Sequence, residues 1–139
     1  MKRFVLDASV ALAWFLDRPI APYADHVRQL LLRGNRAVVP ALWQLEVANG
    51  FIISERRGLL APSETVEALQ NLDAVIAQAM ENSQDVVSMR RALHTGRKFN
   101  LTAYDAVYLE TALGQDLPLA TLDRQLAAAA AKAGVQILS

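Results

Sequence analysis

Four acidic residues have surroundings that an ordinary surface carboxylate would not have. They are Asp7, Glu46, Asp105 and Asp123. Asp7 is the only acid within residues 4–16, a segment of otherwise small, apolar or aromatic residues apart from Ser9. An unpaired charge in a buried segment costs several kcal/mol, so Asp7 must cap a helix, lie exposed at a strand end or bind something positive.

If these four carboxylates lie close together, they would form a binding site for a cation. Their mutual repulsion raises their pKa values unless a cation compensates. Ligation by oxygen alone, without His or Cys, favours a hard divalent ion such as Mg²⁺ or Mn²⁺. Sites of this kind carry out phosphoryl chemistry, often with two ions ~4 Å apart.

Each acid also has a purely structural interpretation. Asp7 and Asp123 could cap the helices that follow them, and Asp105 could form a capping box with Thr102 in the T-x-x-D pattern. Glu46 lies in the middle of a predicted helix, where no capping role exists, although a hydrogen bond or an arginine partner would explain it. The combination of four such acids therefore carries more weight than any one of them.

The elements that must position these acids alternate between short apolar strands and helices. We predict strands at 3–6, 37–39, 117–120 and 135–138, and helices at 9–16, 23–33, 42–57, 63–76, 83–98, 102–113 and 123–132; residues 75–80 fit a helix or a third strand. This alternation predicts a three-layer α/β/α sandwich with a mainly parallel central sheet. Ligands of such sheets bind beyond the carboxyl ends of the strands, which is where Asp7 and Asp123 fall.

Composition excludes several classes of function. The chain has 139 residues, which we expect to form one domain, 1–139, and it contains no cysteine, so disulfides, zinc thiolates and thiol nucleophiles are ruled out. The net charge is zero, so nucleic acid would have to bind a local basic patch. The 53% hydrophobic content hints at a surface covered by a partner. No segment predicts a membrane span or signal peptide, and we expect a cytoplasmic protein.

Four segments resemble the signature blocks of the PIN domain, and in particular the VapC-like ribonuclease toxins of type II toxin–antitoxin systems. These segments are VLDASVALAWF, the helix with Glu46 and Asn49 spaced E-x-x-N, LTAYDAVYLETAL and LATLD. The resemblance extends over essentially the whole chain. It implies an endoribonuclease that uses one or two Mg²⁺ or Mn²⁺ ions to hydrolyse phosphodiester bonds in RNA, leaving a 5′-phosphate and a 3′-hydroxyl.

The resemblance also implies roles for single residues. Asp7 would be the central metal ligand, and the other three acids would bind ions directly or through water. Thr121 and Ser9 would hydrogen-bond the carboxylates or the scissile phosphate, and Asn49 would orient Glu46 or line the pocket. Candidate RNA contacts are basic residues near the Asp105 helix and beside Asp123, namely Arg97, Lys98 and Arg124, with Arg90 and Arg91 nearby; exposed basic residues are, however, ordinary on helices.

The same family suggests partners and leaves alternatives open. It usually forms homodimers and is silenced by a cognate antitoxin whose peptide blocks the pocket. Candidate contact residues, which could equally be core, are the aromatics Trp14, Phe15, Trp43 and Phe51. The alternatives are a non-cleaving PIN-fold module that binds RNA or protein, and a phosphoacceptor or phosphatase with Asp7 as nucleophile. The absence of a second acid at position 9 argues against the D-x-D form of the latter.

Overall fold

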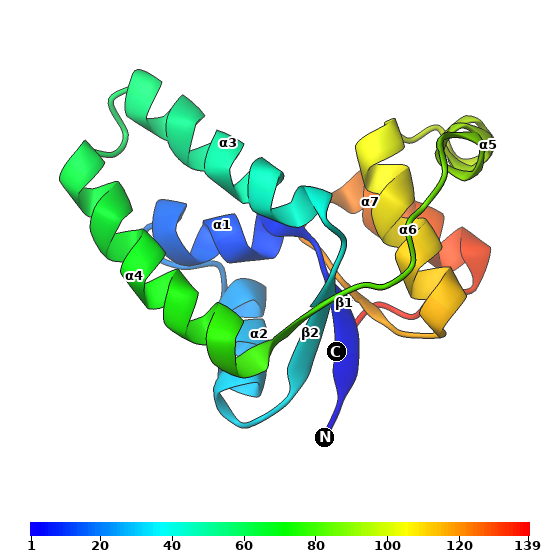
Figure 1. Ribbon diagram of the computed structural model, residues 1–139, viewed down its shortest axis with the longest axis horizontal. Helices are drawn as coiled ribbons and strands as arrows, with labels where there is room; N and C mark the ends of the chain where they lie inside the picture. Colours follow the sequence, from blue (N-terminus) through cyan, green and yellow to red (C-terminus); the bar gives the residue numbers. More distant parts are fainter.

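A four-stranded parallel sheet forms the centre of the protein in a computed structural model that describes residues 1–139 (Figure 1). The strands are β1 (Arg3–Leu6), β2 (Arg36–Val39), β3 (Met80–Asn82) and β4 (Leu119–Ala120), in the order β3-β2-β1-β4. All neighbours are parallel, and β1 pairs Phe4 with Ala37 of β2 and Leu6 with Ala120 of β4. The predicted parallel sheet is therefore confirmed.

Seven helices cover the sheet in two layers. On one side lie α1 (Ala8–Leu16), α2 (Pro22–Leu32), α3 (Leu42–Arg56) and α4 (Pro62–Ala79); on the other lie α5 (Met89–Phe99), α6 (Ala103–Gln115) and α7 (Arg124–Ala133) (Figure 1). The first group is held together by contacts of α1 with α2 and α3, and of α2 with α4. In the second, α6 packs on β1 and contacts both α5 and α7. The predicted three-layer sandwich is confirmed.

Burial of both faces of the sheet explains why β1, β2 and β4 are apolar apart from the arginines that begin β1 and β2. Phe4, Val5 and Leu6 of β1 are fully buried, as expected for a parallel strand covered by helices on both sides. The indole N–H of Trp14 donates to the carbonyl of Ala24 at 2.8 Å, which ties α1 to α2. No helix combines the length and the apolar character that crossing a bilayer requires.

Three predicted elements differ from the structure, which also settles the open assignment of residues 75–80. The helix expected at 83–98 begins only at Met89, because the Ser88 side chain accepts the Arg91 N–H and caps it there. Residues 75–79 belong to α4, and the third strand follows at 80–82. The strand expected at 135–138 is reduced to a single bridge between Leu119 and Ile137. The expected strand 117–120 keeps only its last two residues, since Pro118 has no N–H to donate.

Candidate acidic site

Asp7 lies where β1 ends, and the sheet register determines its neighbours. Because Leu6 pairs with Ala120, Asp7 is placed beside Thr121, and its N–H donates to the Ala120 carbonyl at 3.0 Å. Its carboxylate Oδ2 accepts hydrogen bonds from the hydroxyls of Ser9 and Thr121, each at 2.7 Å. Asp7 occupies the N-cap position of α1, yet its side chain makes no capping hydrogen bond. The capping interpretation is therefore wrong for Asp7.

The buried position of Asp7 disfavours the charged form of its carboxylate. The residue is only 5% exposed, and burial is the main reason that its pKa lies above the ordinary value. The Ser9 and Thr121 hydrogen bonds act in the opposite direction, and the negative charge of Asp123 raises the pKa further. The two hydroxyls therefore help to keep a buried carboxylate charged next to another acid.

Glu46 reaches the same region from the second turn of α3. Its Oε1 accepts a hydrogen bond of 2.5 Å from the hydroxyl of Tyr108 on α6. Burial raises the pKa of Glu46, the Tyr108 hydrogen bond lowers it, and the charge of Asp7 raises it again. Asn49 is exposed on α3 and makes no hydrogen bond to Glu46, so the residue that orients Glu46 in this structure is Tyr108.

Tyr108 was missed by the sequence reasoning. It is fully buried, and burial, the hydrogen bond to Glu46 and the charges of Glu46 and Asp7 all raise its pKa far above the ordinary value. The phenol therefore remains a hydrogen-bond donor. One signal was available: Tyr108 follows Asp105 by three residues, which places the two on one face of a helix.

Asp105 lies in the first turn of α6 but its carboxylate does not help to cap the helix. The Thr102 side chain accepts the Asp105 N–H at 3.2 Å, which is one half of the predicted capping box. The reciprocal hydrogen bond from the Thr102 N–H to the Asp105 carboxylate is not formed. Instead, burial and then the charges of Asp123, Asp7 and Glu46 raise the pKa of Asp105 to about 6. The Asp105 carboxylate thus lies within the electric field of all three other acids.

Asp123 has a structural role and also contributes its charge to the site. Its Oδ1 accepts the Leu126 N–H at 2.9 Å and caps α7, so the capping interpretation is confirmed here. Its own N–H donates to the Thr121 hydroxyl at 3.0 Å. The negative charge of Asp123 nevertheless raises the pKa values of both Asp7 and Asp105.

The carboxylates form a loose group rather than a preformed metal cage. No three His, Asp or Glu side chains are arranged so that they could hold one metal ion by themselves. The donor set is nevertheless all oxygen, and its members raise one another's pKa values. Mg²⁺ usually keeps several waters and binds through one or two carboxylates, so these residues fit a hydrated divalent cation.

The basic residues near the acids fall into two groups. Arg97 and Lys98 lie exposed in the last turn of α5, and Arg124 lies exposed directly after Asp123. Arg91 differs, because it donates two hydrogen bonds of 2.9 and 3.0 Å to Asp85 and lies 3.5 Å from Glu110. Arg91 is therefore already paired with acids of the fold, unlike Arg97, Lys98 and Arg124.

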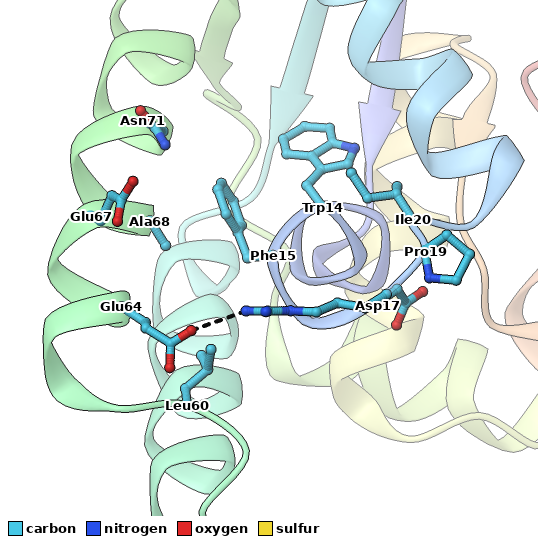
Figure 2. A pocket seen from close by; sticks show the side chains of 11 residues that line it. Trp14, Phe15, Asp17, Pro19, Ile20, Leu60, Glu64, Glu67, Ala68 and Asn71 are labelled. Atoms are coloured by element: carbon cyan, nitrogen blue, oxygen red, sulfur yellow. Dashed lines mark hydrogen bonds and ion pairs between the residues drawn. The ribbon is translucent and has the colours of Figure 1, made fainter.

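A separate hollow lies between α1 and α4, away from the four acids. It measures about 430 Å³, and its lining includes Trp14, Phe15, Arg18 and Glu64 (Figure 2). The Arg18 guanidinium pairs with Glu64 at 3.0 Å. Among the four aromatics considered as contact residues, Trp14, Trp43 and Phe51 are buried in the core, whereas Phe15 is partly exposed here.

Comparison with known proteins identifies the family of this chain. The family model described as the PIN domain matches residues 4–132. The chain belongs to the PIN domain family. PIN domains typically are metal-dependent nucleases that bind RNA.

Solved structures agree with the PIN fold. The crystal structure of PAE2754 from Pyrobaculum aerophilum has a TM-score of 0.70 and 22% sequence identity, over 92% of this chain and 84% of that one. A domain of a functionally unknown protein from Methanocaldococcus jannaschii has a TM-score of 0.59 and 14% identity, over 100% of this chain and 92% of that one. No curated protein sequence matched the chain. At these identities the likeness extends to the fold alone.

Proposed function

We propose that this PIN domain, spanning residues 1–139, is an Mg²⁺- or Mn²⁺-dependent endoribonuclease that acts as the toxin of a toxin–antitoxin pair. The observation that carries the proposal is the pKa of Asp105, which burial and then the charges of Asp123, Asp7 and Glu46 raise to about 6. Four carboxylates that repel one another are stabilised by a divalent cation. A cation among carboxylates is also the chemistry that hydrolyses phosphodiesters.

The side chains would divide the work as follows. Asp7 would be the central ligand, since Ser9 and Thr121 hold its Oδ2 in place. The remaining ligands, directly or through water, would be Glu46, Asp105 and Asp123. When one or two ions are bound, they offset the charge of the phosphate and lower the pKa of the attacking water.

RNA binding requires positive charge next to this acidic region. Arg124 follows Asp123 directly, and Arg97 and Lys98 end the helix that precedes α6. All three are exposed, so their charges are accessible to phosphates. We propose that they contact the RNA backbone on either side of the scissile bond.

Exposed apolar side chains on α3 and α4 support the proposal that this surface binds other proteins. Leu45 is 74% exposed, Val66 57% and Ile52 46%. A cleft of about 200 Å³ between the two helices is lined mainly by apolar residues, among them Val47 and Leu69. Apolar surface of this kind marks interaction sites, and we propose that a second copy of the chain and the antitoxin peptide cover it.

The test compares the purified chain with its Asp7→Asn variant on a 3′-labelled single-stranded RNA in the presence of Mn²⁺. We expect cleavage that leaves 5′-phosphate ends, and a loss in the variant larger than the ~10–100-fold typical when only an outer partner of a metal ligand is removed. Expression of the wild type, but not of the variant, should arrest growth. An Asp7→Asn protein that cuts at the wild-type rate would contradict the mechanism, whereas RNA binding without cleavage by the wild type would establish the non-cleaving module.

A further inference from the structure

Tyr108 and Glu46 join two helices that cover different sides of the sheet. Tyr108 belongs to α6 and Glu46 to α3 (Figure 1). The phenol hydroxyl of Tyr108 donates to Oε1 of Glu46 at 2.5 Å. The backbone N–H of Ala8, the first residue of α1, also lies close enough to the phenol oxygen to affect its pKa. The hydroxyl therefore lies at the junction of the segments that carry Asp7, Glu46 and Asp105.

We propose that Tyr108 is a positioning residue that holds the Glu46 carboxylate in place for a divalent cation. The proposal rests on the metal-dependent function above and adds to it a residue that sets the strength of metal binding. It follows from three features: the full burial of Tyr108, the single hydrogen bond it makes, and the position of Glu46 on its helix.

Without this bond, Glu46 would have little to hold it. The flanking Leu45 and the nearby Asn49 are exposed, whereas Val47 is buried, so Glu46 lies at the boundary between the core and the solvent. The Tyr108 hydroxyl is the only hydrogen-bond partner of the Glu46 carboxylate, and Oε2 accepts none. A glutamate side chain that is fixed only on binding loses up to ~2 kcal/mol of rotamer entropy at that moment. A tether already present before the ion arrives avoids that cost.

The choice of acceptor separates this role from ordinary packing. A buried phenol needs an acceptor, and a backbone carbonyl can serve: the partly buried Tyr23 donates to the carbonyl of Leu138 at 2.7 Å. Tyr108 instead donates to a carboxylate that already feels the charge of Asp7. Packing alone does not call for an acid at this point, whereas binding a cation does.

The experiment replaces Tyr108 with phenylalanine, which keeps the buried ring and removes only the hydroxyl. Tyr23→Phe is the matched control, because it also removes one tyrosine hydroxyl with one internal acceptor, outside the acidic site. Mn²⁺ binding to the full chain without RNA is measured by electron paramagnetic resonance. We expect the Kd for Mn²⁺ to rise ~10-fold or more in Tyr108→Phe and to stay within twofold of wild type in Tyr23→Phe.

Two further measurements identify how the residue acts. On RNA, Tyr108→Phe should lower kcat by a similar factor and leave KM nearly unchanged. In a Glu46→Ala background the added Tyr108→Phe change should have no further effect on the Kd for Mn²⁺, since residues that act through one another are not additive.

The outcomes distinguish this inference from the proposed function. If the wild type binds Mn²⁺ and cuts RNA while Tyr108→Phe behaves like Tyr23→Phe, the positioning role is overturned and the nuclease proposal stands. A Tyr108→Phe effect of undiminished size in the Glu46→Ala background would also overturn it. A wild-type chain that binds no Mn²⁺ would overturn both.

Discussion

Replacing Asp105 with asparagine should stabilise the protein in the absence of metal at neutral pH. Asp105 is partly buried and feels the charges of Asp123, Asp7 and Glu46, which together raise its pKa from 3.8 to about 6. Asparagine has nearly the same shape and no charge, and the N–H of residue 105 can still donate to Thr102. The substitution therefore removes the cost of burying a charge, and the repulsion from the other acids, without removing the helix cap.

The size of the effect follows from the pKa difference. The folded protein binds the Asp105 proton about two units more tightly than the unfolded chain, and each unit corresponds to ~1.4 kcal/mol. Because the carboxylate is only half-buried, solvent screening reduces the resulting ~3 kcal/mol to about 1–2 kcal/mol. Below about pH 4 both states hold the proton and there is no penalty. As the pH rises from about 4 to about 6, the unfolded chain releases the Asp105 proton before the folded protein does, so the wild type loses stability relative to Asp105→Asn. Above about pH 6 the difference in unfolding free energy between the two proteins is constant.

Urea unfolding in a chelating buffer at several pH values between 4 and 8 measures this difference. The free energy of unfolding of Asp105→Asn should match the wild type near pH 4 and exceed it by about 1–2 kcal/mol at pH 8. Asp73→Asn, which alters an exposed aspartate on α4, is the control and should show no such divergence. If the wild-type and Asp105→Asn curves stay parallel over the whole range, the carboxylates do not interact as the structure indicates.

Three further results are expected. EDTA should stop RNA cleavage and excess Mn²⁺ or Mg²⁺ restore it, whereas rescue by zinc alone would contradict ligation by oxygen. Ser9→Ala combined with Thr121→Val should raise the pKa of Asp7 further, since both lost hydrogen bonds favour the charged form. The acidic limb of the pH–rate profile should then move to higher pH. If the limb does not move, the titration of Asp7 does not cause it. Arg97→Ala with Lys98→Ala should flatten the slope of log K for single-stranded RNA against log[salt] by about 1.4, while Arg91→Ala, which breaks the pair with Asp85, should lower the Tm and leave that slope unchanged.

The position of Asp7 could be predicted because it depends on backbone rules. A short apolar strand followed by a helix predicts a parallel sheet, and the carboxyl ends of neighbouring parallel strands meet at one edge. The register of β1 with β4 brings Asp7 and Thr121 together as those rules require. The helix predicted at 83–98 begins later than expected, because helical periodicity does not reveal that Ser88 is the residue that caps it.

The partners of the side chains could not be predicted in the same way. The T-x-x-D pattern is identical whether or not the aspartate returns a hydrogen bond to the threonine N–H, so the state of the Asp105 carboxylate had to come from the structure. Tyr108 likewise looks like one more apolar core residue until its hydroxyl is seen to meet Glu46, 62 positions away in sequence.

The structure suggests what separates a structural acid from one available for chemistry at the start of a helix. The first N–H groups of a helix need acceptors, and an acid that supplies one has part of its carboxylate occupied. Thr102 supplies that acceptor for α6 and so releases Asp105, whereas α7 has only Asp123. In α1 the Asp7 side chain makes no capping bond, and Ser9 and Thr121 bind one of its oxygens instead. The Asp105 carboxylate accepts no hydrogen bond and therefore has the most capacity left for a cation, so its loss should weaken Mn²⁺ binding more than the loss of Asp123.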